Sequence, residues 1–185
     1  AAHWRGLLGD RVEDHNVFAG AFVDRIGERR KDPEWLARAA KSGDCRFVPV
    51  WGDRCLAGGD PPHTILLPRH KVESFIDDDH LIFLGLYQDR PAFAFSIDRE
   101  QPAPFEELGE FRDLRLLGTI LPPDEANLVA HARALVLWHA SQLFCGVCGT
   151  AARPEAGGNA RVCMNADCSR IIFPRVDPAI IVLVS

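Results

Sequence analysis

Four of the six cysteines in this 185-residue sequence lie close together after residue 144. Cys145 and Cys148 form a C-x2-C pair, and after fourteen intervening residues Cys163 and Cys168 form a C-x4-C pair. Two such pairs allow two tight turns to direct four sulfur atoms at one point, and Zn²⁺ takes four thiolates tetrahedrally at about 2.3 Å. Because four thiolates leave no position for water or substrate, we expect a structural zinc ion.

Other interpretations of these cysteines remain open. A reducing compartment, our working assumption, disfavours disulfides, and the paired spacing disfavours four buried free thiols. An iron–sulfur cluster is the remaining alternative for the same ligands. We expect Cys45 and Cys55 to be buried free thiols, and His131 and His139 to be packing or surface residues.

Two β-hairpins are predicted before the cysteines. Residues 45–58 read as two strands that turn at Gly52-Asp53, and residues 80–98 as two longer strands that turn around Gln88-Asp89-Arg90. In the last strand small residues alternate with Phe93, Phe95 and Ile97, which suggests one better-buried face. Residues 16–25 are expected to form a further strand that leads into a loop.

Two helices complete the predicted pattern. Residues 32–43 favour a short helix, with Asp32 placed to cap it and Pro33 in its first turn. Residues 122–144 predict the clearest helix, which leads directly to Cys145. We therefore expect an α+β fold, divided into a mixed N-terminal domain (1–121), a connecting helix (122–144), a zinc ribbon (145–173) and the start of a further domain (174–185).

Composition narrows the function classes. Hydrophobic residues make up 47% and charged residues 25%, as in a soluble globular protein, and the net charge of −5 argues against a broad nucleic-acid-binding face. Few basic residues lie near the cysteines: Arg153, Arg161, Arg170 and Arg175. No apolar stretch is long enough for a transmembrane helix and no secretory signal is recognisable, so we expect a cytoplasmic protein without a membrane partner.

The region from residue 80 to residue 184 resembles the NADH pyrophosphatase branch of the Nudix hydrolases, and the resemblance is fainter before it. In that family a helix runs into an "FC-x-x-CG" knuckle, a zinc ribbon follows, and an aromatic-Pro-Arg-x-Asp-Pro stretch precedes the first catalytic strand. The matching residues here are Trp138, His139, Phe144, Cys145, Cys148, Gly149, Cys163, Cys168, Phe173, Pro174, Arg175, Asp177 and Pro178. The C-x4-C pair departs from the C-x2-C of some bacterial members.

The resemblance implies a function. It implies hydrolysis of the NAD(H) pyrophosphate to nicotinamide mononucleotide and AMP with Mg²⁺ or Mn²⁺, and related members act on NAD-capped RNA. It also implies a homodimer, a first catalytic strand at 179–184, and an aromatic residue at Phe173 that stacks on a substrate base. In the alternative interpretation, Phe173 only packs the ribbon against the domain.

The catalytic motif of that family does not match this sequence. The Nudix pattern is G-x5-E-x7-R-E-U-x-E-E-x-G-U, where U is a bulky aliphatic residue, and its glutamates bind the catalytic metal. Only "EELG" at 106–109 matches part of it, and the other key positions fail. We therefore expect this chain to be a fragment of a longer protein. The catalytic glutamates would lie outside the fragment, and the fragment alone would be inactive. The alternative function is a non-catalytic, zinc-braced dimerisation or interaction module.

Overall fold

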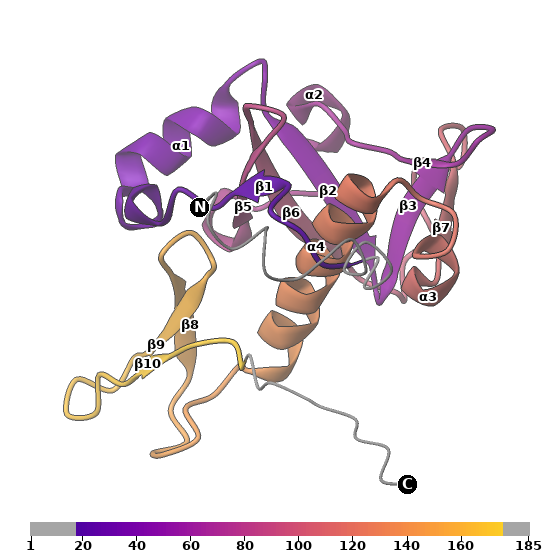
Figure 1. The fold of residues 1–185 in the computed structure, drawn as a ribbon. Coiled ribbons are helices and arrows are strands. Elements are labelled where there is room, and N and C mark those ends of the chain that lie inside the picture. Colours follow the sequence, from indigo (N-terminus) through magenta and orange to yellow (C-terminus); the bar gives the residue numbers. More distant parts are fainter. Residues whose placement is uncertain (1–17, 176–185) are drawn as a thin grey trace, which may run out of the picture.

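The fold was analysed in a computed structural model that describes residues 18–175 (Figure 1). This part of the chain contains both strands and helices, and its last three strands form a separate small sheet. In order, the elements are β1 Val23–Asp24, η1 Gly27–Lys31, α1 Pro33–Lys41, β2 Arg46–Trp51, β3 Arg54–Gly58, β4 His63–Thr64, α2 Arg69–Val72, η2 Asp78–His80, β5 Ile82–Tyr87, β6 Arg90–Ile97, β7 Glu110–Arg112, α3 Leu114–Leu117, α4 Pro123–Ser141, β8 Ala152–Glu155, β9 Ala160–Cys163 and β10 Ile171–Ile172.

Within the described residues, the larger sheet has seven strands in the order β1-β5-β6-β2-β3-β4, with β7 also pairing with β3. Both predicted hairpins are confirmed, since β2 and β3 turn at Gly52-Asp53 and β5 and β6 turn at Gln88-Asp89. The two hairpins join through β2 and β6, which pair in parallel. The expected strand at 16–25 is only the short β1, and β4 and β7 were not predicted.

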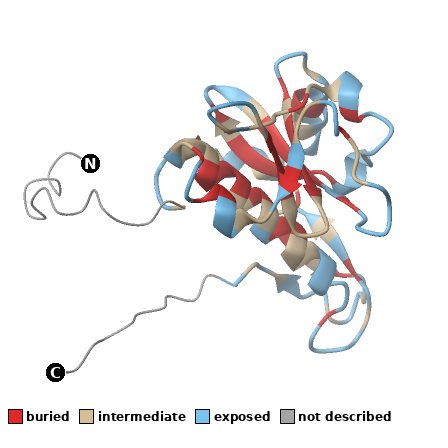
Figure 2. Ribbon diagram, turned by 90° about the vertical axis from the view of Figure 1, so that its right-hand side faces the viewer, coloured by how far each residue is buried: buried red, intermediate tan, exposed pale blue. Residues whose placement is uncertain are grey.

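Both faces of this sheet are buried, so the expectation of one better-buried face is wrong. The small residues of β6 lie under α4, and Phe93 and Phe95 form part of a second core cluster on the other face. Along β6 only Arg90 and Ser96 are exposed and Pro91 is half-buried. Buried residues gather in the middle of the molecule, and exposed ones lie mainly in its outer loops (Figure 2). Residues alternate between small and large along β6 because a helix packs closely against one face of the strand, whereas an aromatic cluster fills the space on the other face.

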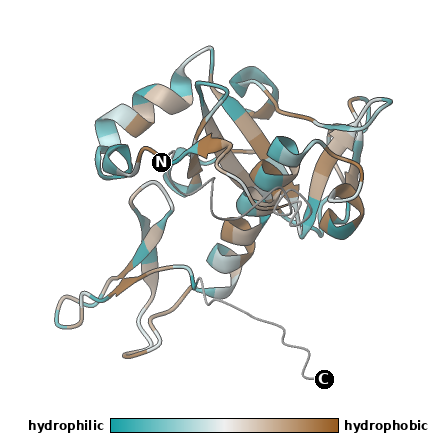
Figure 3. Ribbon diagram, viewed as in Figure 1, coloured by the Kyte–Doolittle hydropathy of each residue, from teal (hydrophilic) through white to brown (hydrophobic). Residues whose placement is uncertain are grey.

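The two predicted helices are present. Helix α1 is capped by Asp32, whose carboxylate accepts the backbone N–H of Trp35 at 2.9 Å. The helix carries a mixture of hydrophilic and hydrophobic residues (Figure 3). Helix α4 is shorter at its end than the predicted 122–144, because Gln142 begins the extended segment that enters the first knuckle. Its first turn is tied to the sheet by the Tyr87 hydroxyl, which donates to the Asp124 carboxylate at 2.6 Å.

The second sheet lies beyond the C-terminal end of α4 (Figure 1). Its strands follow the order β10-β9-β8, all antiparallel, and it carries the four clustered cysteines. We call residues 143–173 the ribbon. The strand expected at 179–184 and most of the segment expected at 174–185 lie outside the described residues. No helix in residues 18–175 has the length and apolar character needed to cross a membrane.

Candidate metal centre and the adjoining groove

The four sulfur atoms of the paired cysteines lie together in the ribbon, all within 4.8 Å of one another. The sulfurs of Cys145 and Cys168 are 3.9 Å apart, and those of Cys148 and Cys163 are 3.4 Å apart. A tetrahedron with zinc–sulfur bonds of 2.3 Å has sulfur–sulfur edges of about 3.8 Å. The donor set and its dimensions therefore fit a four-thiolate Zn²⁺ site.

Backbone turns hold the sulfurs in this arrangement. In the first knuckle the Gly149 N–H donates to the Cys145 carbonyl at 2.9 Å, and Gly149 takes a φ of +74°, which favours glycine. In the second knuckle the Cys168 N–H donates to the Asn165 carbonyl at 3.0 Å. The Asn165 side chain accepts the Asp167 N–H at 3.0 Å. This extra turn accommodates the two additional residues of the C-x4-C pair.

The thiols in this cluster differ in acidity. A hydrogen bond from the Thr150 backbone lowers the pKa of Cys148 to about 6, so this sulfur is largely thiolate at neutral pH. Burial raises the pKa of Cys163 to about 12. A bound divalent cation supplies the positive charge that favours the thiolate form at all four positions.

The remaining two cysteines lie apart from this cluster in the larger domain. Cys45 and Cys55 are fully buried free thiols, as predicted. Burial raises the pKa of each to about 12, so both are neutral and behave as small apolar core residues. They therefore contribute to packing and not to the metal centre.

The tip of the ribbon docks on the larger sheet through contacts that the sequence did not predict. The Phe83 N–H donates to the Gly157 carbonyl at 2.7 Å, and the Asn159 side-chain amide donates to the Phe83 carbonyl at 2.8 Å. Gly157 has a φ of +59°, and a Cβ atom there would lie 3.2 Å from Leu36 Cδ1. We call residues 155–160 the docking tip. The "GGN" sequence at residues 157–159 is typical of a tight turn and could have predicted one here.

His139 joins the helix to the docking tip. Its Nε2 lies 2.7 Å from the Gly158 carbonyl and its Nδ1 lies 2.8 Å from the Arg161 guanidinium. These partners fit a neutral ring that donates to Gly158 and accepts from Arg161. Burial, followed by the charges of Arg161 and His80, lowers the pKa of His139, although the Gly158 bond opposes this shift. The interpretation of His139 as a packing residue is therefore confirmed.

Phe173 follows the ribbon and lies beside a groove. It is 64% exposed, and the groove that it lines has a volume of about 1070 Å³. The groove runs between α4, the segment from β1 to η1, and the ribbon, and also contains Trp138 and Arg175. The structure thus places Phe173 on an accessible surface, close in the chain to the metal centre but not in contact with any described aromatic ring.

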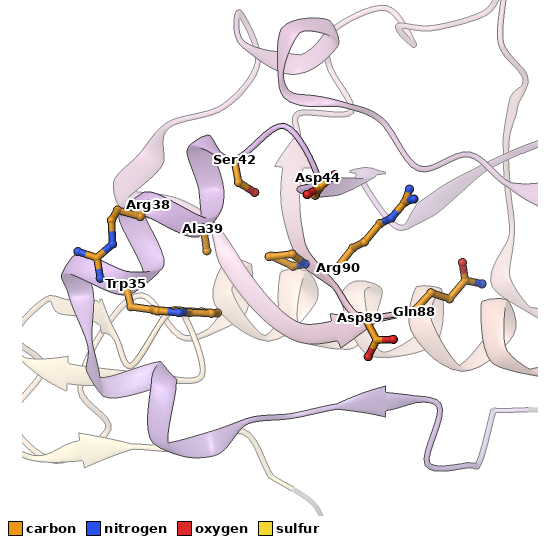
Figure 4. Close-up of a pocket in the computed structure, with 9 residues that line it drawn as sticks. Trp35, Arg38, Ala39, Ser42, Asp44, Gln88, Asp89 and Arg90 are labelled. Carbon is orange, nitrogen blue, oxygen red and sulfur yellow. The ribbon is translucent and has the colours of Figure 1, made fainter.

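A second hollow lies on another part of the surface, between the end of α1 and the β5–β6 turn (Figure 4). It has a volume of about 620 Å³. Arg38 and Arg90 alternate around it with Asp44 and Asp89, so cations and anions are balanced. It contains no cluster of metal ligands, which in the described residues occurs only at the four cysteines.

Comparison with known proteins agrees with this architecture. Residues 45–138, about half of the chain, match the family described as "NADH pyrophosphatase-like rudimentary NUDIX domain". Residues 140–173 match the "NADH pyrophosphatase zinc ribbon domain". The two matches follow one another along the chain, and the second contains all four clustered cysteines.

Individual relatives are similar over much of the chain. The human NAD-capped RNA hydrolase NUDT12 is 40% identical, covering 96% of this chain and 48% of the relative. The NAD-capped RNA hydrolase NudC of Deinococcus radiodurans is 41% identical, covering 57% and 35%. The chloroplastic Nudix hydrolase 19 of Arabidopsis thaliana is 29% identical, covering 78% and 34%.

The chain thus spans at most about half the length of these relatives. Its match to the family nevertheless covers the central sheet, the long helix and, through the second match, the complete cysteine cluster. The chain belongs to the family of NADH pyrophosphatase-like Nudix domains that carry a zinc ribbon.

Proposed function

We propose that this chain is the N-terminal and zinc-ribbon part of a Nudix hydrolase that cleaves the pyrophosphate of NAD(H) to nicotinamide mononucleotide and AMP. The observation that carries the proposal is the four-sulfur ribbon, followed directly by the exposed Phe173. The relatives named as NAD-capped RNA hydrolases support NAD-capped RNA as a second substrate. In this proposal residues 1–121 form the N-terminal domain, residues 122–144 the connecting helix, residues 145–173 the zinc-binding domain within the ribbon, and residues 174–185 the start of the catalytic domain.

The proposed role of the ribbon is structural. Cys145, Cys148, Cys163 and Cys168 would hold one Zn²⁺ ion and thereby fix the backbone that leads to Phe173. Phe173 would stack on a base of the substrate, since its ring is exposed at the groove and free of described aromatic partners. Cys45 and Cys55 are unpaired thiols and the other four cysteines form the metal cluster, which supports a reducing, cytoplasmic compartment as part of this proposal.

The catalytic Mg²⁺ or Mn²⁺ has no fitting ligand set in the described residues. Carboxylates are its preferred ligands, whereas the cluster of potential metal ligands found in residues 18–175 consists of cysteines alone. We therefore assign this cation to glutamates outside residues 18–175, and we propose that this 185-residue chain is inactive alone.

The first experiment compares NADH hydrolysis by this chain and by the longer product of its gene, in the presence of Mg²⁺ or Mn²⁺. We expect turnover only with the longer product. Turnover by the 185-residue chain would contradict the assignment of the catalytic cation, and inactivity of both would contradict the proposed reaction.

A pair of matched variants tests the role of Phe173. In the longer product, Phe173→Ala should lower kcat/KM for NADH by roughly 5- to 150-fold, the range of about 1–3 kcal/mol for one stacked base. Phe144→Ala is the control, because Phe144 is similarly exposed, at 60%, and does not line the groove. Equal losses in both variants would show that Phe173 only packs the ribbon.

A zinc-braced dimerisation or interaction module remains the second candidate function. Several exposed apolar side chains on the ribbon favour it: Leu143, Phe144, Val147, Met164 and Ile171. A homodimer is compatible with both proposals. Light scattering on this chain should give twice the monomer mass, and a monomer at high concentration would contradict the module.

A further inference from the structure

Arg161 of β9 is a buried cation that has no carboxylate partner among the described residues. It is only 6% exposed, and none of the ion pairs within residues 18–175 includes it. Its Nε is buried and lacks a hydrogen-bond partner in the same part of the chain. A guanidinium keeps its charge inside a protein, and a buried charge without a counter-charge is costly. An apolar side chain of similar size would avoid this cost, so stability alone does not explain an arginine here.

The two terminal nitrogens of Arg161 join the ribbon to the long helix. Nη1 lies 2.8 Å from Nδ1 of His139 on α4, and Nη2 donates to the Ala152 carbonyl of β8. A planar guanidinium presents both donors at a fixed angle, whereas the ammonium group of a lysine would not. The arginine therefore fixes two strands of the ribbon against one place on α4.

This contact adjoins both sides of the groove beside Phe173. On α4, the ring of His139 lies 4.8 Å from that of Trp138, edge to face, and Trp138 lines the groove. On the ribbon, Arg161 lies opposite Ile172 in the pairing of β9 with β10, so their side chains share one face of the small sheet. Ile172 also lines the groove and precedes Phe173 in the chain.

We propose that Arg161 is a positioning residue that sets where Phe173 lies relative to α4. The inference rests on the proposed function, in which Phe173 stacks on a base of the substrate. Arg161 does not touch the substrate, since it is buried and is not among the residues that line the groove. It acts through Ile172, and a displacement of about 1 Å that begins far from the chemistry can lower a rate about 10²-fold.

Kinetics of the longer product of the gene test this role. Arg161→Met removes the guanidinium and keeps an extended side chain. It should raise KM for NADH about tenfold and leave kcat unchanged, because a lost stack weakens the ground state and the transition state alike. Partial unfolding would instead lower kcat at an unchanged KM. In a Phe173→Ala background, Arg161→Met should have no further effect, since both changes remove the same interaction.

A fluorine label tests the position of the Phe173 ring without relying on turnover. In the longer product made with fluorinated phenylalanine, the fluorine resonance that Phe173→Ala removes belongs to this ring. It should shift in Arg161→Met. Arg153→Met is the matched control, because Arg153 is exposed on β8 of the same ribbon and does not line the groove; it should change neither the resonance nor KM. If Arg161→Met does not fold, Arg161→Lys keeps the charge without the fork and should give a smaller shift in the same direction.

The outcomes separate this inference from the proposed function. An unchanged Phe173 resonance in a folded Arg161 variant, an unchanged KM, or an equal shift in Arg153→Met would overturn the positioning role. Losses that multiply when Arg161→Met and Phe173→Ala are combined would also overturn it. NADH turnover by the wild type with an unmoved resonance in Arg161→Met would reject only the positioning role. A shifted resonance in a product that does not hydrolyse NADH would reject only the proposed reaction.

Discussion

The larger sheet and the ribbon are stabilised in different ways. The sheet buries two apolar clusters, one on each face, that contain large side chains such as Phe47, Phe83 and Leu128. The ribbon buries only a few residues, among them Cys145 and Cys163, and leaves Val147, Met164 and other apolar side chains exposed. Burial of apolar area stabilises the first region, whereas the second has too small a core and depends on its metal ligands.

The difference shows how a region without a core of its own acquires a fixed position. The ribbon is held at its base by four sulfurs and at its tip by the contacts of Gly157, Asn159 and Arg161 with the larger domain and α4. Loss of either attachment should have different consequences for the two regions. Four perturbations, ordered by expected effect, test this contrast.

Removal of the metal should have the largest effect. Four-thiolate zinc sites contribute on the order of 10–16 kcal/mol of binding free energy that becomes folding free energy. Cys163→Ser, or a chelator, should therefore unfold the ribbon and leave the larger sheet folded, as seen by amide exchange. Elemental analysis should find about one zinc per wild-type chain. Cys45→Ala is the control and should retain the metal. A ribbon that stays fully folded without metal would contradict the conclusion that its stability depends on the metal ligands.

A core deletion should act in the opposite way. Phe47 is fully buried and contacts Phe93 and Phe95, so Phe47→Ala should lower the free energy of unfolding of the sheet by about 3–5 kcal/mol. Denaturant titration measures this loss. Zinc content should not change in the native variant. Loss of zinc in parallel with stability would show that the two regions fold as one unit.

The docking tip should have an intermediate effect. Asn159→Ala removes the amide that bonds to the Phe83 carbonyl and leaves this acceptor unpaired, at a cost of about 1–3 kcal/mol. Exchange of the Phe83 amide hydrogen should accelerate, because its acceptor is Gly157 of the same tip. Arg153→Ala, an exposed change on the same hairpin, should leave that exchange unchanged. Slow exchange at Phe83 in Asn159→Ala would show that the tip is held by other contacts.

The smallest effect should be the part of the pH dependence that His139 carries, since the pKa of His131, which falls to about 3, makes a separate and larger contribution. Its folded-state pKa lies below the ordinary value of 6.5, so between these two values the unfolded chain binds more protons than the folded one. The free energy of unfolding should therefore fall as pH decreases below about 6.5. His139→Gln should remove this part of the pH dependence, whereas His70→Gln on the exposed surface of α2 should not. Parallel pH profiles for wild type and His139→Gln would disprove the role of His139.

Local patterns in the sequence predicted local structure well. Residue types at Gly52-Asp53 and Asp32 indicated a hairpin turn and a helix cap, and both are present. The cysteine spacing predicted a cluster whose sulfurs do lie together. In each case the determining interactions lie within a few residues, or are fixed by the geometry of four shared ligands.

Features that depend on distant segments could not be predicted. The parallel pairing of β2 with β6 joins two hairpins, and neither hairpin sequence specifies it. The burial of both faces of β6 requires α4, which begins at Pro123. The groove beside Phe173 is lined both by Arg30 of η1 and by Arg170 of the ribbon, and nothing in either local sequence indicates that these two segments lie on one groove.

The position of the cysteine cluster along the chain has a consequence for synthesis. Every strand of the larger sheet, together with α4, is complete by Ser141, before the ribosome adds Cys145. Domains generally fold as units during synthesis, the earlier one first, so the sheet can form around its own core before any zinc ligand exists. In a cell short of zinc, the chain would then carry a folded domain followed by a tail of unligated thiols, and metal supplied later would complete it without refolding the rest.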